Sequence, residues 1–190
     1  SLGKKGVDVF TLSSNRNNLS SSSRFIKGNF ACFSDFEIYC ARKQKQFLLW
    51  PVTDIGMSEC FNYIAEDEKD IIFPFSSYES YKTLSNKLSL IDIADKLNIL
   101  CPRTLISNGM SLLNHTNVKL STLQYPLVLK PSTSIVSTPQ GWMKTGVKYA
   151  ADQDEFVSLV SKEPFSSHPF LIQERIQGPG IGIFLLTEQG

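Results

Sequence analysis

Two apolar segments each end in polar residues, and both have a pattern typical of β-strands. Tyr125–Pro131 reads Tyr-Pro-Leu-Val-Leu-Lys-Pro, and Phe170–Ile176 reads Phe-Leu-Ile-Gln-Glu-Arg-Ile. Because side chains alternate between the faces of a strand, Lys130 is expected on the face opposite Leu129. A lysine among apolar strand residues is costly unless an anion meets it. Since glycines follow the second segment, the pair predicts a nucleotide-binding slot.

A hydroxyl-rich segment, residues 132–145, follows the first of these strands and is predicted to be a loop. It contains six serine and threonine residues, with Ser132 and Ser134 near its start and Lys144 near its end. Loops that hold phosphate offer backbone N–H groups, hydroxyl groups and a cation. The segment is a candidate phosphate cover, although the same composition is also typical of an ordinary solvent-facing loop.

The composition indicates a globular chain with room for one or two small domains. Its 190 residues are 42% hydrophobic and 19% charged, with a formal net charge of +1. This balance gives no argument for nucleic acid or a membrane surface as a partner, and no apolar run approaches the ~20 residues that span a bilayer. Without a signal-peptide pattern, we expect a cytoplasmic chain whose four cysteines are reduced and buried: Cys32, Cys40, Cys60 and Cys101.

The first part of the chain alternates predicted strands and helices. Strands are expected at 6–12, 29–33, 47–52 and 71–75, and helices at 36–46 and after an N-cap at Asp54. Strand–helix alternation with short connections predicts a parallel, doubly wound α/β sheet. The glycine-rich turn of a classical dinucleotide site is absent.

The second part mixes helices with more widely spaced strands. Residues 78–98 are predicted to be helical in two segments, the second opened by Lys87, and residues 110–123 are predicted to be helical in part. Asp152 and Glu155 form a predicted capping box for the next helix. Besides the two segments described first, strands are expected at 103–106, 146–150 and 181–187.

From Lys87 to Phe184 the chain resembles the ATP-grasp superfamily, in particular its carbamoyl-phosphate-synthetase-like and biotin-carboxylase-like members. The motifs that carry the likeness are Asn86-Lys87, Asn98–Thr104, Tyr125–Lys130, the helix capped by Asp152, and Leu171–Gly178. The resemblance implies an α/β chain with a partial Rossmann-like pre-grasp domain at 1–77, lacking its first strand. The first part of an α+β ATP-grasp domain follows at 78–190. This part divides into a helical subdomain and linker (78–124) and the ATP-binding strands and lid (125–190).

The resemblance also implies roles for particular residues. Lys87 and Lys130 correspond to the two lysines that contact ATP phosphates, and a lid would carry Ser132, Ser134 and Lys144. The hinge segment, whose backbone meets the adenine edge, would be Glu174, Arg175, Ile176 and Gln177. On helical spacing alone, Lys87 reads as an ordinary solvated lysine.

The activity implied by the resemblance is that of an ATP-dependent ligase. Such an enzyme activates a carboxylate as an acyl phosphate and couples it to an amine; the sequence identifies neither substrate and leaves a homo-oligomer open. Mg²⁺ is the implied cofactor, but the family's acidic ligands on later strands have no counterpart here and are expected beyond Gly190. Because both ends look truncated, we expect catalysis from a full-length protein, with no catalytic residue in this chain and no activity from it alone.

Two other classes remain open. One is a nucleotide-binding or regulatory module that does not catalyse. The other is a protein-kinase-like fold, the weaker alternative because His-Arg-Asp and Asp-Phe-Gly elements are absent. His115 and His168 are too isolated in sequence to predict a metal site.

Overall fold

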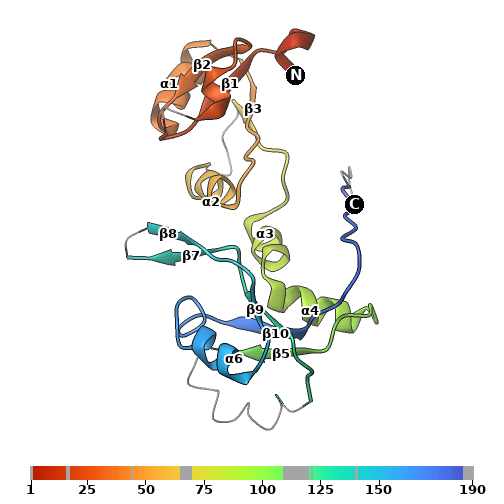
Figure 1. The fold of residues 1–190 in the computed structure, drawn as a ribbon. Helices are drawn as coiled ribbons and strands as arrows, with labels where there is room; N and C mark the ends of the chain where they lie inside the picture. Colours follow the sequence, from red (N-terminus) through yellow and green to blue (C-terminus); the bar gives the residue numbers. More distant parts are fainter. Residues whose placement is uncertain are drawn as a thin grey trace. The chain divides into compact units, whose positions relative to one another are not determined.

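The structure is a computed structural model that divides the chain into two compact units, Ser1–Ser76 (unit 1) and Ser77–Gly190 (unit 2) (Figure 1). It describes residues 2–15, 18–43, 45–64, 70–108, 120, 122–139 and 141–185.

Unit 1 contains two pairs of parallel strands with helices after them. β1 pairs with β2, and β3 pairs with β4, both in parallel. The parallel pairing expected for this part is therefore confirmed, but the described strands form two separate two-stranded sheets rather than one doubly wound sheet. The elements in chain order are η1 (Leu2–Lys5), β1 (Val9–Leu12), η2 (Leu19–Ser22), β2 (Ile26–Phe30), α1 (Phe33–Lys43), β3 (Phe47–Leu48), α2 (Asp54–Tyr63) and β4 (Ile71–Ile72).

An aromatic-rich core holds unit 1 together. Phe36 and Cys40 lie one helical turn apart on α1 and are buried with Ile71 of β4. Phe30 and Phe47 pack against this cluster from β2 and β3, with ring centroids 5.5 and 5.8 Å from that of Phe36. The spacing of apolar residues that predicted the helix thus places its apolar face on the strands.

Some boundaries in unit 1 differ from those predicted. β2 begins at Ile26 because its first residues pair with the start of β1, a long-range constraint that local composition does not show. The N-cap of α2 is Thr53 rather than Asp54. The Thr53 Oγ1 atom accepts a hydrogen bond from the Gly56 N–H at 3.0 Å, and Asp54 is the first helical residue.

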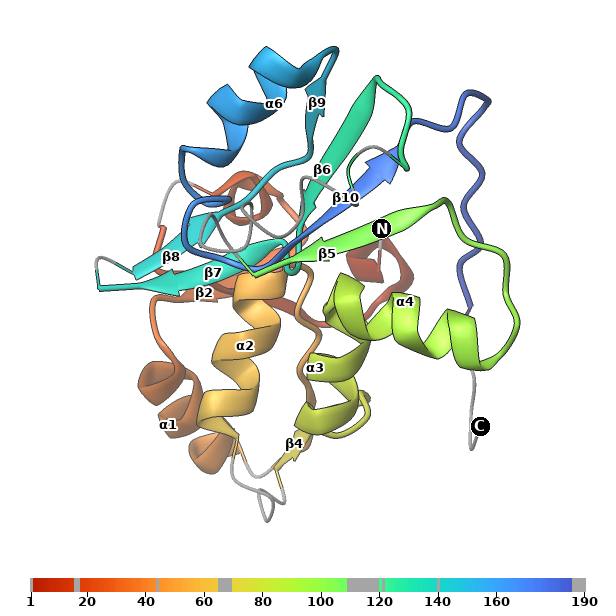
Figure 2. The ribbon, with the colours of Figure 1, turned by 90° about the horizontal axis from the view of Figure 1, so that it is seen from below.

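Unit 2 is built on a four-stranded antiparallel sheet with the order β5-β10-β6-β9, which Figure 2 shows as neighbouring arrows. A separate antiparallel hairpin is formed by β7 and β8. The elements are α3 (Tyr78–Ser85), α4 (Lys87–Lys96), β5 (Thr104–Ser107), β6 (Leu127–Pro131), β7 (Ile135–Thr138), β8 (Gly141–Lys144), β9 (Lys148–Ala150), α6 (Gln153–Val160) and β10 (Phe170–Glu174). The prediction of two helical segments around Lys87 is confirmed.

The core of unit 2 lies between one face of this sheet and α6. Leu127 and Leu129 of β6 are fully buried with Phe170 and Ile172 of β10, and Phe156 of α6 packs into the same cluster. Asp152 caps α6 as predicted, since its Oδ1 atom accepts from the Glu155 N–H at 2.9 Å; the Glu155 carboxylate accepts in return from the N–H of Ala151. The alternation predicted for β6 therefore holds for its apolar residues.

The segment 132–145 is mostly a β-hairpin, and the prediction of a loop was wrong. Ile135 pairs with Lys144, and Val136 pairs with Met143. The base of the hairpin is closed by a hydrogen bond from the Thr145 N–H to the Ser134 carbonyl oxygen at 3.0 Å. The serine and threonine count suggested a loop, but β-branched residues at alternating positions favour an extended backbone.

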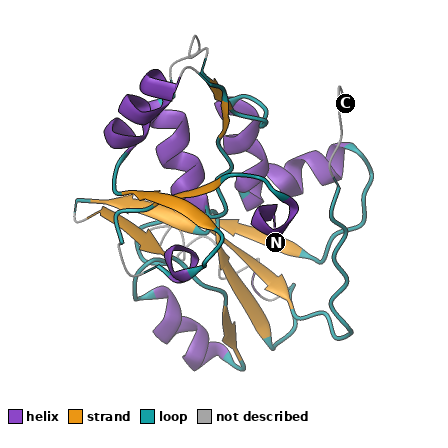
Figure 3. Cartoon of the chain, turned by 90° about the horizontal axis from the view of Figure 1, so that it is seen from above, coloured by secondary structure: helices purple, strands orange, loops and turns teal. Residues whose placement is uncertain are grey.

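The predicted strand at 181–187 does not form in its described part, residues 181–185. Figure 3 shows loop from the end of β10 through these residues. Ile181 and Phe184 are 88% and 97% exposed. An extended apolar segment becomes a strand only by pairing, and no described strand pairs with this one. The predicted helix at 110–123 lies largely outside the described residues.

No helix in the described ranges combines the length and apolar character that crossing a membrane requires.

The described cysteines are free thiols, and only two of them are buried as expected. Cys40 and Cys60 are each 3% exposed. Cys32 lies in the turn before α1, and Cys101 lies in a loop beside Pro102; both are exposed, so their predicted burial was wrong. Burial raises the pKa of the Cys60 thiol to about 11.

These environments predict that two of the thiols react quickly with a disulfide reagent and two react slowly. At pH 8 only about a thousandth of Cys60 would be thiolate, the form that attacks a disulfide reagent. A thiol–disulfide reagent such as dithionitrobenzoate should therefore modify Cys32 and Cys101 quickly and Cys40 and Cys60 slowly. The Cys60→Ala variant should keep the full fast phase, and urea should make all four thiols of the parent chain react. A fast phase that shrinks in Cys60→Ala would contradict the assignment.

Candidate functional site

The start of α4 is fixed to the end of β6 by backbone hydrogen bonds at Ser132. The Lys87 N–H donates to the Ser132 carbonyl oxygen at 2.8 Å, and the Ser132 N–H donates to the Pro169 carbonyl oxygen at 2.9 Å. Asn86 caps α4, its Oδ1 atom accepting from the Leu88 N–H at 2.9 Å. A helix start and two strand ends therefore meet at one residue.

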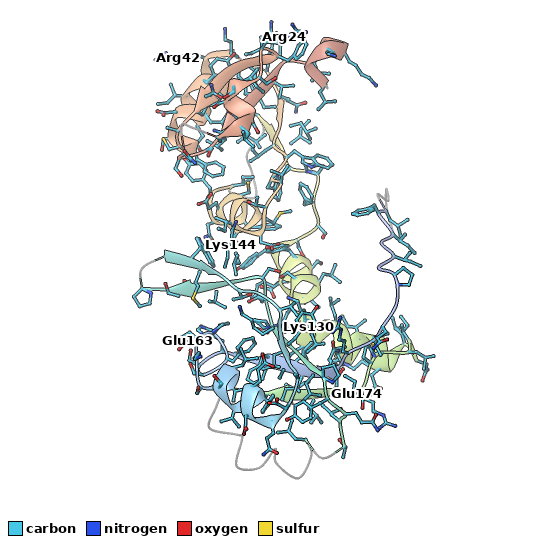
Figure 4. All side chains as sticks on the ribbon, viewed as in Figure 1. Arg24, Arg42, Lys130, Lys144, Glu163 and Glu174 are labelled. Carbon is cyan, nitrogen blue, oxygen red and sulfur yellow. The ribbon has the colours of Figure 1, made fainter. Side chains whose placement is uncertain are left out.

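This junction brings Lys87 and Lys130 to the same end of the sheet. Both side chains are partly buried, and Figure 4 labels Lys130 near the meeting point of the sheet and α4. Among the described residues, no carboxylate forms an ion pair with the Lys130 Nζ atom. Two lysines whose main chains lie at one end of the sheet suit an anionic ligand.

Lys130 lies on the face of the sheet opposite the core, which we call the Lys130 face. Directly paired residues of antiparallel strands share a face. The pairing thus assigns seven residues to it: Thr104, Ile106, Val128, Lys130, Tyr149, Leu171 and Gln173. Three of its members are polar or aromatic (Thr104, Tyr149 and Gln173) and three are aliphatic, whereas the other face is filled by the unit 2 core.

The residues of the predicted lid have different environments. Ser132 is buried and its backbone forms the junction, so its main role in the structure is to join elements. Ser134 and Lys144 are exposed, the first at the base of the hairpin and the second on β8 opposite Ile135. The hairpin therefore carries one candidate hydroxyl group and one candidate cation.

The predicted hinge begins where β10 ends. The strand stops at Glu174, two residues earlier than predicted, and the Arg175 N–H donates to the Pro126 carbonyl oxygen at 3.2 Å. Ile176 and Gln177 follow in neither a turn nor a strand, and among the described residues their backbone groups have no hydrogen-bond partner. Free backbone donors and acceptors at this place could read the edge of a planar base.

The Glu174 carboxylate is engaged in contacts within the protein. Its Oε1 atom accepts from the Gln124 N–H at 3.2 Å and lies 4.0 Å from the Arg103 Nη1 atom. The carboxylate thus holds the segment before β6 against the end of β10. This arrangement leaves any ligand contact of residue 174 to its main chain.

Two contacts on the Lys130 face were not predicted from the sequence. Gln173 is 3% exposed, and its Nε2 atom donates to the Thr104 Oγ1 atom at 2.7 Å, which links β10 to β5. The Arg175 guanidinium lies 5.4 Å from the centroid of the Tyr149 ring. A glutamine directly after three apolar strand residues was a signal for the first contact; the second depends on pairing between distant segments.

The described residues offer no metal centre. No group of three or more His, Cys, Asp or Glu side chains occurs among them, so they do not fit the implied Mg²⁺. His168 contacts Ser167 and Glu163, and hydrogen bonding by Ser167 is the main cause that lowers the pKa of the Glu163 carboxyl. His115 lies outside the described residues.

Comparisons with known proteins identify the fold. The chain is similar to an N5-carboxyaminoimidazole ribonucleotide synthetase solved as its ADP complex, with a TM-score of 0.62 and 14% identity over 92% of this chain. It is also similar to the phosphoribosylamine–glycine ligase of Thermotoga maritima, with a TM-score of 0.56 and 15% identity over 94% of this chain. No family model matches the chain, and no curated protein matches it in sequence.

The chain therefore has an α/β fold of the ATP-grasp type, as the sequence resemblance implied. It spans 43% of the length of the synthetase and 40% of the length of the ligase.

The cap at Asn86 is expected to stabilise the junction. The Asn86→Ala substitution removes the acceptor for the Leu88 N–H and should destabilise unit 2 by about 1 kcal/mol, whereas Asn86→Ser should retain most of the stability. Urea unfolding followed by Trp142 fluorescence, in a Trp50→Phe background, would measure the difference. Equal stability of the alanine and serine variants would contradict the capping role.

Proposed function

We propose that this chain supplies the adenine- and phosphate-binding elements of an ATP-dependent ligase that joins a carboxylate to an amine through an acyl phosphate. The observation that carries the proposal is the 2.8 Å hydrogen bond from the Lys87 N–H to the Ser132 carbonyl oxygen, since it gathers both lysines at one end of β6. The fold similarity to a synthetase solved with ADP supports it.

The size of the Lys130 face suits a nucleotide. Lys130 pairs with Leu171, and three residues along β10 lead from there to Glu174 at the hinge. At 3.3 Å per residue the separation is about 10 Å, comparable to that between the edge of an adenine and the first phosphates of an extended nucleotide. Phosphates at Lys130 and a base at Ile176 and Gln177 would then lie along one strand.

Each element has a defined role in this proposal. Lys130 and Lys87 would offset phosphate charge as compact ammonium groups, and the backbone of residues 174–177 would contact the adenine edge. Ser134 and Lys144 on the β7–β8 hairpin would cover the phosphates from a lid. Ser132 would keep α4 against the sheet through its backbone while its hydroxyl remains a further phosphate donor.

In this proposal, the reactive group is supplied by the nucleotide. Bound ATP supplies a phosphoryl group that makes the carboxylate reactive toward an amine. The residues of this chain would bind the nucleotide and orient its phosphates. The described residues hold no cluster fit for Mg²⁺, so no metal-dependent step is assigned to them. The subgroup of the superfamily and a cytoplasmic location stay predictions, and a homo-oligomer stays open.

The proposal predicts unequal contributions from the lysines. The Lys130→Ala variant should lose about tenfold or more in ATP affinity, because a charge-assisted hydrogen bond on a partly buried face is removed. Lys87→Ala should lose less, since its side chain reaches from a helix start. Titration calorimetry with ATP at constant ionic strength would measure both.

The matched control is Lys148→Ala, which removes the same charge from the neighbouring strand β9. Lys148 pairs with Leu129 and so belongs to the face opposite Lys130. Its substitution should leave ATP affinity within about twofold, as expected for a screened surface charge. Unchanged affinity in Lys130→Ala, or an equal loss in Lys148→Ala, would refute the phosphate role of Lys130.

A further inference from the structure

Unit 1 contains a small pocket outside the proposed nucleotide site. Its volume is about 180 Å³, and its lining comes from two chain segments that precede paired strands: Gly3, Gly6, Val7 and Asp8 before β1, and Arg24, Phe25 and Lys27 at the start of β2. Figure 4 labels Arg24 at the edge of unit 1 where η1 lies. The pocket is smaller than the ~300–1,000 Å³ of pockets for drug-sized ligands, so it suits a small group.

The pocket lies at the amino edge of the parallel pair β1–β2, where Val9 and Ile26 begin the pairing. Ligands of open parallel α/β sheets bind at the carboxyl edge, outside the ends of the strands. The fold alone therefore does not predict a ligand at the amino edge. Evidence for a ligand there has to come from the side chains of this chain.

Basic groups surround the pocket. The Arg24 Cζ atom lies 5.0 Å and the Lys4 Nζ atom 5.9 Å from the centroid of the Phe25 ring. Arg24 and Lys27 are the two basic residues of the lining, Lys4 lies beside it, and Asp8 is the acidic residue of the lining. The Lys27 Nζ atom is 4.0 Å from the Asp8 Oδ1 atom, and both side chains are largely exposed, so this contact is weak and an anion could compete for the Lys27 ammonium group.

Two glycines allow the wall of the pocket to form. A Cβ atom at Gly3 would lie 2.6 Å from the Phe25 Cβ atom and 2.9 Å from the Phe25 carbonyl oxygen, so only glycine lets η1 approach this closely. Gly6 has a φ of +83°, a conformation that side chains disfavour. Phe25 and η1 are thus packed together, which places Lys4 of η1 and Arg24 beside the pocket.

We propose that this amino-edge pocket binds a small dianion of the phosphate class, either free phosphate or the phosphate group of a phosphomonoester. Arg24 and Lys27 in the lining exceed Asp8 by one positive charge, and Lys4 beside the Phe25 ring adds a second, an excess that suits a phosphate, which carries about −1.5 to −2 at pH 7. The planar fork of Arg24 suits two phosphate oxygens at once, and Lys27 and Lys4 add point charges.

The test is a titration of the full chain with inorganic phosphate, followed by amide chemical shifts in ¹H–¹⁵N NMR spectra at constant ionic strength. Saturable shifts are expected at Gly3, Gly6 and Phe25. Glycerol 3-phosphate serves as a phosphomonoester, and acetate as a monoanionic carboxylate that should bind at least tenfold more weakly. Tighter binding of glycerol 3-phosphate than of phosphate would identify the phosphomonoester as the ligand.

Two variants and one control distinguish specific phosphate binding in the pocket from non-specific attraction to positive charge. Arg24→Gln and Lys27→Gln should each weaken phosphate binding about tenfold, the order expected for a lost charge-assisted contact. Arg42→Gln removes the same charge from the exposed last turn of α1, outside the pocket lining, and should leave binding unchanged. Equal weakening by Arg42→Gln and Arg24→Gln, or shifts that never saturate, would overturn the proposal.

The Lys130→Ala variant makes this test independent of the nucleotide site. If phosphate binds the pocket, the shifts at Gly3 and Gly6 keep their midpoint in Lys130→Ala. If they vanish there, the pocket is not a site of its own and the proposal is wrong.

Discussion

Three elements of unit 2 depend on the backbone of one residue, Ser132. Its carbonyl oxygen accepts from the first amide of α4, and its N–H donates to Pro169, directly before β10. Burial makes these bonds necessary, because a buried backbone group without a partner costs free energy comparable to a lost hydrogen bond. With Ser132 8% exposed, the junction holds Lys87 and Lys130 at one end of the sheet whatever their own side chains contact. The proposed nucleotide site follows from this constraint.

The alternation of side chains along β6 is the second constraint. Leu127 and Leu129 are fully buried in the unit 2 core, so Lys130 must lie on the opposite face. A shift of the strand by one residue would place the ammonium group in the core and expose both leucines. The apolar core therefore fixes the register, and the register presents the lysine to a ligand. The Thr104–Gln173 bond supports the same face from a neighbouring strand.

Local sequence patterns predicted the helices and strands better than they predicted burial and strand pairing. The apolar spacing around Phe36 and the capping signal at Asp152 were sufficient, because both depend on residues a few positions apart. The β7–β8 hairpin was missed because the serine and threonine content suggested a loop, and the early start of β2 was missed because it depends on pairing with β1. The exposed Cys32 and Cys101 were misjudged because burial reflects tertiary packing. The candidate site followed from motif order, whereas the Glu174 contact with Gln124 required the structure.

The central claim is that Lys130, the α4 start and residues 174–177 form one nucleotide site. An ATP titration monitored by ¹H–¹⁵N NMR would test it most directly. We expect the amides of Lys87, Lys130, Ile176 and Gln177 to shift together with one midpoint, and AMP to perturb the last two more than the first two. Different midpoints for the two lysines and for Ile176 and Gln177, or shifts confined to other parts of the chain, would contradict a single site.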